Sequence, residues 1–109
     1  MINYHEVEAV DAEHGAEGVR VRWLITKEDG AEHFAMRLFE MASGGHTPLH
    51  SHEWEHEVFI LDGHGHVILG DDERAFNAGD VIFIPGNLRH RFRNTGAQPV
   101  RFLCLIPYL

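Results

Sequence analysis

The sequence predicts an all-β fold, an antiparallel sandwich or barrel. Residues 19–26, VRVRWLIT, alternate so that Val19, Val21, Trp23 and Ile25 share one face, which is the period of a β-strand. Roughly nine to eleven short stretches of strand character follow one another, separated by turns that contain glycine. No stretch has the pattern of a long helix. Short strands at regular spacing are typical of sandwiches and barrels.

The expected elements follow the chain in order. Residues 1–18 are acidic and contain two glycines, and they predict an N-terminal arm or strand ahead of one domain at 19–109. Residues 42–45, Ala-Ser-Gly-Gly, are expected to form a loop, and residues 62–65 a turn. The expected strands are 19–26, 34–41, 49–52, 57–61, 66–69, 74–77, 81–84, 89–93 and 100–106.

Composition excludes several classes of partner. With 109 residues the chain has the size of one domain, and its net charge of −8 argues against a nucleic-acid partner. The basic residues are scattered except for Arg89, Arg91 and Arg93, which alternation places on an outer face opposite His90. No apolar run could span a bilayer and no signal peptide is evident, so we expect no membrane partner and a cytoplasmic location. The single cysteine excludes an intramolecular disulfide.

Histidines are the most informative residues. Three of the ten, His50, His52 and His56, follow one another at spacings of two and four within residues 44–63. Side chains at i and i+2 of an extended strand point to the same face, so His50 and His52 can project into one interior. After a bend, His56 shares a face with the apolar residues that follow it. We therefore expect these imidazoles to converge on a metal ion. His5, His14, His64 and His66 are expected to be exposed instead.

Two stretches resemble the two motifs of the cupin superfamily. The first runs Gly44, five residues, His50-Ser51-His52, three residues, His56, six residues, Gly63; the second runs Gly79, five residues, Pro85, then His90 and, after three residues, Asn94. The ending FLCLIP adds to a resemblance, over residues 19–107, to small bacterial single-domain cupins that bind manganese through four histidines. The resemblance implies a double-stranded β-helix, the jelly-roll barrel.

The sequence departs from the cupin pattern at two positions. His56 occupies the ligand position usually held by glutamate, and Asn87 replaces the usual glycine after Pro85. Asparagine accepts the left-handed backbone region better than most residues, so the second change is tolerable. The first has a chemical consequence. A divalent ion with four neutral ligands keeps its +2 charge, and we expect it to favour anionic ligands and to be harder to oxidise than one with a carboxylate ligand.

The resemblance implies that His50, His52, His56 and His90 hold one divalent transition metal, with positions left open for water or substrate. Imidazole binds many such ions, so ligand type does not choose between them. The resemblance favours Mn²⁺, with Fe²⁺, Ni²⁺, Cu²⁺ and Zn²⁺ as alternatives.

The last strand is expected to supply a substrate pocket. Phe102, Cys104 and Ile106 share one face, which the resemblance places in the pocket wall, although simple core packing is an equal alternative. Phe92 points inward beside His90, and Trp54 either covers the site or packs at a strand end. Cys104 lies in an apolar run, which favours an inert buried thiol. Beyond the metal site we expect no catalytic residue, because the chain shows neither a nucleophile elbow nor a phosphate-binding loop.

Three functions are compatible with this site. The first is a small metal-dependent oxidoreductase, dioxygenase-like, that activates oxygen or peroxide beside a small organic substrate. The second is a non-redox isomerase or lyase in which the ion polarises a carbonyl. The third is a binding or sensor module without turnover. The outer residues Phe59 and Leu61 would suit an interface, and we expect a homodimer.

Overall fold

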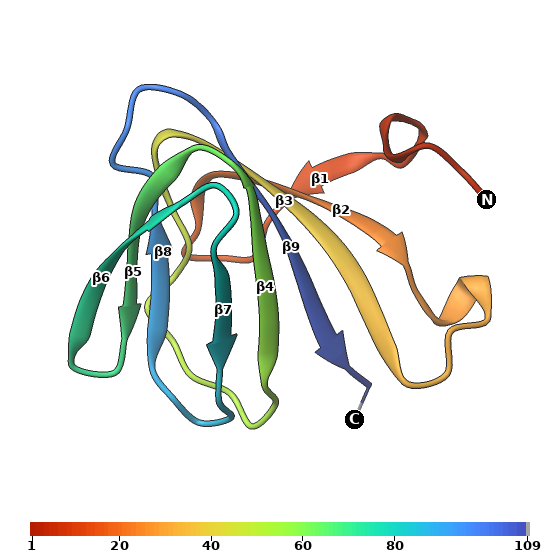
Figure 1. Cartoon of the computed structure of the whole chain (residues 1–109). Coiled ribbons are helices and arrows are strands. Elements are labelled where there is room, and N and C mark those ends of the chain that lie inside the picture. The colour runs from red at the N-terminus through yellow and green to blue at the C-terminus, as the bar shows by residue number, and fades with distance from the viewer. Residues whose placement is uncertain (109) are drawn as a thin grey trace.

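The computed structural model describes residues 1–108 and is almost entirely β-structure (Figure 1). Two single 3-10 turns, η1 (Tyr4–Glu6) and η2 (Lys27–Asp29), are the helical segments of this range, and neither is long enough to cross a lipid bilayer. The strands are β1 (Ala9–Asp11), β2 (Glu17–Ile25), β3 (Phe34–His46), β4 (His56–Asp62), β5 (His64–Leu69), β6 (Asp72–Asn77), β7 (Val81–Ile84), β8 (His90–Arg93) and β9 (Val100–Pro107).

All strand pairs are antiparallel and form one sheet in the order β6-β5-β8-β3-β9-β4-β7, with β2 on β3 and β1 on β2. The long strand β3 joins the β6-β5-β8 part of the sheet to the β9-β4-β7 part, because residues 34–41 pair with β9 and His46 pairs with Arg93 of β8. In Figure 1, β6, β5 and β8 lie on one side of the molecule and β9, β3 and β2 on the other. This curled sheet is the jelly-roll barrel, so the predicted fold class is confirmed.

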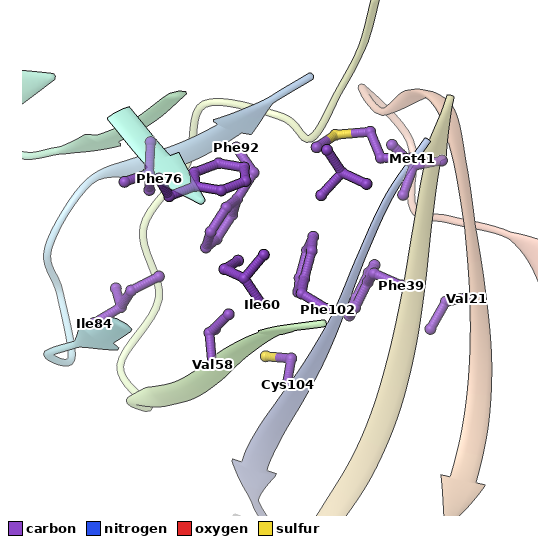
Figure 2. Packing of buried hydrophobic residues seen from close by; sticks show 13 residues of the cluster. Val21, Phe39, Met41, Val58, Ile60, Phe76, Ile84, Phe92, Phe102 and Cys104 are labelled. Atoms are coloured by element: carbon purple, nitrogen blue, oxygen red, sulfur yellow. The ribbon is translucent and has the colours of Figure 1, made fainter. Parts of the chain in front are cut away.

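Alternation along the strands explains which residues form the core. In β4, His56, Val58 and Ile60 are buried, whereas Glu57 and Phe59 between them are exposed. Three aromatic rings stack within the core: Phe102 stacks on Phe39 at a centroid distance of 5.0 Å and on Phe92 at 4.8 Å (Figure 2). Burying aromatic rings of this size is a major source of stability for a small domain.

The structure corrects the expected loop at residues 42–45, which continue strand β3. Asn94 is the partner that keeps this stretch extended: its N–H donates to the Gly45 carbonyl at 2.9 Å, and its carbonyl accepts from the Gly44 N–H at 3.1 Å. Gly45 is required here, because a Cβ atom would lie 2.9 Å from the Glu17 carbonyl oxygen. Gly45 thus serves the close approach of neighbouring strands, whereas Gly44 has open space around it and supplies a left-handed φ of 78°.

The expected strand at 49–52 is also wrong. Only His50 pairs there, in an isolated bridge to His90, with N–O distances of 3.2 and 2.9 Å. Pro48 has no N–H to donate and so cannot extend the ladder towards Thr47. Residues 64 and 65, expected in a turn, instead begin β5. His50 and His52 are thus held by one bridge and a loop and not by a regular strand.

Candidate metal centre

Four imidazole rings gather on the wall of the barrel. His50 comes from the isolated bridge, His52 from the loop that follows, and His56 and His90 are the first residues of β4 and β8. Ring centroids of His52 lie 4.7, 4.6 and 5.1 Å from those of His50, His56 and His90. His90 lies 4.8 Å from His50 and 5.1 Å from His56. Histidines from both halves of the chain therefore form one cluster.

The ring nitrogens of this cluster fit a nitrogen-ligated metal ion. Ligand atoms of His50, His52 and His90 all lie within 4.8 Å of one another, and Nε2 of His56 is 3.1 Å from Nε2 of His52. Two facing imidazole nitrogens either share one proton or direct both lone pairs at a common cation. Converging lone pairs of this kind are the donor set that divalent transition metals bind.

Neighbouring groups fix the orientation of two of the rings. The Nδ1 atom of His90 lies 2.8 Å from the Leu88 carbonyl, so it carries the proton and leaves Nε2 with a lone pair. The Nδ1 atom of His56 lies 3.1 Å from Sγ of Cys104. Partners that hold the second nitrogen in this way are a regular feature of metal-binding histidines.

The electrostatic environment favours the uncharged form of three of these rings, those of His52, His56 and His90. Burial, reinforced by the nearby Arg37 charge and the other imidazoles, lowers the pKa of His56 to about 3. Burial also lowers the pKa of His52 and of His90 below the usual value for histidine. Neutral imidazole is the form that binds a metal, so the protein presents these rings ready for an ion near pH 7.

The loop that carries His52 is held from two sides. The Trp54 ring stacks on the His52 ring at 4.1 Å and 5°, so it packs directly against the cluster. Asn87 donates its backbone N–H to the His52 carbonyl at 2.6 Å, and it adopts the left-handed region with φ 67°. Gly86 lies so close to this loop that a Cβ atom would be 2.3 Å from the Glu53 carbonyl oxygen. The turn before β8 therefore positions His52.

A cavity of about 370 Å³ opens beside the four histidines. The five residues expected in a pocket all line it, namely Trp54, Phe92, Phe102, Cys104 and Ile106. Other apolar groups in its wall are Val10, Val21, Trp23, Phe39 and Ile84. A largely apolar cavity with a few polar groups is the usual form of a small-molecule site.

The sequence interpretation missed three charged residues in this cavity, Arg37, Asp11 and Glu13. Arg37 had a recognisable signal, because it is a cation at an inward position of β3 between the buried Ala35 and Phe39. Asp11 and Glu13 come from the N-terminal arm and have no such signal in the sequence. Arg37 also approaches Cys104, with Nη2 3.1 Å from Sγ, so this thiol has a charged neighbour that is distant in sequence.

Of the four histidines outside the cluster that were expected to be exposed, three are exposed and His66 is not. His5, His14 and His64 are exposed, and the half-buried His66 lies 2.9 Å from the Thr95 hydroxyl through Nδ1. Arg93, on the face opposite His90, forms an ion pair with Glu73.

Comparison with known proteins settles the family. The sequence family described as cupin domain matches residues 37–106, which include all four histidines and most of the barrel. This chain is a cupin. Over 104 residues it is 34% identical to an oxalate-binding protein of Thermotoga maritima, covering 91% of this chain and 84% of that protein.

Two other similar proteins are enzymes by name. This cupin is 38% identical over 71 residues to 1-methylthio-D-xylulose 5-phosphate methylsulfurylase of Rhodospirillum rubrum, covering 65% of this chain but only 46% of that enzyme. The cupin therefore spans about half the length of that relative. Its fold superposes on the polyketide cyclase RemF of Streptomyces resistomycificus with a TM-score of 0.92 and 36% identity, covering 98% of this chain and 78% of that one.

Proposed function

We propose that this cupin is a metal-dependent enzyme acting on a small organic substrate, with His50, His52, His56 and His90 holding one divalent transition metal. The observation that carries the proposal is the cluster of four imidazoles in the wall of an apolar cavity. Four protein ligands leave positions open in the coordination shell of an octahedral ion, as a catalytic site requires.

The protein's own contribution is binding, orientation and exclusion of water. A divalent ion bound here supplies Lewis acidity and, for a redox metal, activation of oxygen or peroxide. The aromatic wall, including Trp54, Phe92 and Phe102, can hold the apolar part of a substrate beside the cluster. The Leu88 carbonyl and the Cys104 sulfur hold the rings of His90 and His56 in place.

Our first candidate reaction is oxidative, with the cupin as a dioxygenase-like oxidoreductase that uses Mn²⁺. The apolar wall of the cavity supports it, because an apolar surround suits reaction of a small organic molecule away from bulk water. We also propose a cytoplasmic location, as expected from the sequence. Fractionating the source cells would test it.

The second candidate is a non-redox reaction in which the ion polarises a carbonyl. It is favoured by the similar proteins, since one is named a methylsulfurylase and one a polyketide cyclase, and neither name denotes an oxygenase. A third reading, binding without turnover, has its counterpart in the oxalate-binding relative.

Metal content is the first test. Plasma mass spectrometry of untagged protein, purified without added metal, should find about one manganese or iron per chain. The His52→Ala variant should lose the metal, whereas His14→Ala, at an exposed histidine, should retain it. A folded wild-type protein that takes up no transition metal, even when ions are supplied, would overturn the proposal.

The candidate reactions differ in what they consume. Oxygen or peroxide uptake that depends on substrate and on the metal supports the oxidoreductase. Rearrangement of substrate under anaerobic conditions, or zinc at full occupancy, transfers support to the non-redox reaction. Saturable binding without product supports the binding module.

A further inference from the structure

Within residues 1–108, Arg37 is a cation in the cavity wall without an acidic partner. Three other arginines of the barrel pair with carboxylates, Arg22 with Glu40, Arg93 with Glu73 and Arg101 with Asp62. Arg37 forms no ion pair with any acidic side chain within residues 1–108. Its Nη2 atom instead contacts Sγ of Cys104 at 3.1 Å and Nδ1 of His56 at 3.4 Å, and its buried Nε atom has no hydrogen-bond partner in the described part of the chain.

Aromatic rings hold the guanidinium in this position. Its central carbon lies 5.3 Å from the Trp23 ring centroid and 4.8 Å from that of Phe39. Cation–π contacts of this kind offset part of the cost of removing the charge from water. These contacts do not provide hydrogen-bond acceptors for the N–H groups of the planar guanidinium. A carboxylate can accept two parallel hydrogen bonds from such a group.

The cavity is also polarised from one side to the other. On one side, the positive charge of Arg37 lies near His56 and Cys104 and acts to lower the pKa of both. On the other side, Glu13 lies near His50, with Oε2 3.8 Å from Nδ1 of His50. His52 and His90 link the two sides through their rings. A ligand with one negative end therefore fits at Arg37, whereas a second negative charge near Glu13 would be repelled.

We propose that Arg37 is the residue that binds the substrate, and that the substrate is a monoanionic carboxylate with an apolar body. The proposal rests on the proposed function and adds its substrate class. One guanidinium is the only Arg or Lys in the cavity wall within residues 1–108, and two carboxylates, Asp11 and Glu13, share that wall. A wall with one positive and two negative side chains suits a ligand with a single negative charge better than a phosphate dianion.

Benzoate is the probe for the test, with benzamide as its neutral counterpart of similar shape. Both tryptophans of the chain, Trp23 and Trp54, line the cavity, so intrinsic fluorescence reports occupancy and calorimetry can confirm it. Benzoate should bind the wild-type protein and benzamide should bind more weakly. Arg37→Met keeps an apolar stem beside Trp23 and Phe39 and should weaken benzoate binding about 10- to 100-fold, the loss of a charged hydrogen-bond pair.

Two further variants make the result specific. Arg37→Lys keeps the charge without the fork, so its loss should be smaller than that of Arg37→Met. Arg74→Met removes one positive charge from the exposed strand β6, outside the cavity, and should bind benzoate as the wild type does. Circular dichroism and metal content, measured on every variant, separate loss of the ligand site from loss of fold or of metal.

The outcomes distinguish this inference from the metal proposal. Equal benzoate binding by Arg37→Met and Arg74→Met overturns the inference, as does a wild-type protein that binds neither benzoate nor acetate. Benzoate binding that is unchanged in Arg37→Met but is lost when the metal is chelated places the carboxylate on the metal, and this result also overturns the inference. Arg37-dependent binding by a protein that takes up no metal supports the inference and counts against the metal proposal alone.

Discussion

The Sγ atom of Cys104 lies 3.1 Å from Nδ1 of His56 and 3.1 Å from Nη2 of Arg37. Burial raises the pKa of this thiol, against the opposing effect of the Arg37 charge. Since Nε2 of His56 faces Nε2 of His52, Nδ1 carries the proton and donates to the sulfur when Nε2 binds an ion. The cysteine therefore orients a candidate metal ligand, in addition to packing in the core.

Removing this sulfur should weaken metal binding. We expect Cys104→Ala to lose about 10-fold in metal affinity, at the lower end of what outer-shell partners of metal ligands contribute. Cys104→Ser keeps an acceptor for Nδ1 and should lose less. Competition with a chromophoric chelator measures the affinity, and Leu103→Ala, at the neighbouring outward position of β9, controls for truncation of the strand. Identical affinities in Cys104→Ala and Leu103→Ala would contradict the role assigned to the sulfur.

A carboxylate at position 56 should make the metal easier to oxidise. In His56→Glu the ion has one anionic ligand, which stabilises its trivalent state, so voltammetry should show a lower oxidation potential. The new carboxylate would also lie near Arg37, whose Nη2 is 3.4 Å from Nδ1 of His56. Because Arg37 competes with the metal for this carboxylate, the decrease in oxidation potential should be smaller. Metal content is checked first. A higher potential in the variant than in the wild type would refute the charge argument.

Stability of the metal-free protein should fall as the pH is lowered from neutrality. The pKa of His56 is about 3 in the folded protein and 6.5 in a reference state without burial, so between these values the unfolded chain binds the extra proton. Acidification therefore favours unfolding over this window, and stability is recovered above pH 6.5.

The measurement is urea denaturation of chelator-treated protein at several pH values. His56→Gln removes one of the titrating groups and should give a shallower decline in the free energy of unfolding than the wild type. His14→Gln, at an exposed position, should reproduce the wild-type dependence. Parallel curves for wild type and His56→Gln would contradict the prediction.

We propose a homodimer that forms through the outer face of β4 and β7. Phe59, Val81 and Phe83 are adjacent there and 43%, 75% and 55% exposed, and β7 ends the sheet with an edge that a second copy could extend. Leu61, the other residue expected at the interface, is half-buried.

Light scattering at micromolar concentration should give the mass of a dimer. Val81→Lys should shift the protein towards monomer, because it buries a charge in the interface. Ile25→Lys introduces the same charge at a 44% exposed apolar residue on β2 and should remain dimeric. A monomeric wild-type protein would refute the proposal.

The amino-acid sequence by itself determined the class of fold and which residues face inward. Strand periodicity is a local property, so the alternation of His56, Val58 and Ile60 in β4 and the bounds of β7 were readable without a structure. The spacing of His50, His52 and His56 predicted that these three would come together, and the resemblance to the cupin motifs added His90.

Only the tertiary structure decided the neighbours across strands. Arg37 and Cys104 are 67 positions apart and meet because β3 pairs with β9 in a register that no local pattern encodes. The loop assigned to residues 42–45 was wrong for the same reason, since Asn94 and Glu17 determine the conformation of Gly45 from other strands. Strand periodicity tells which side of a strand a residue occupies, and long-range hydrogen bonding decides which residue it faces.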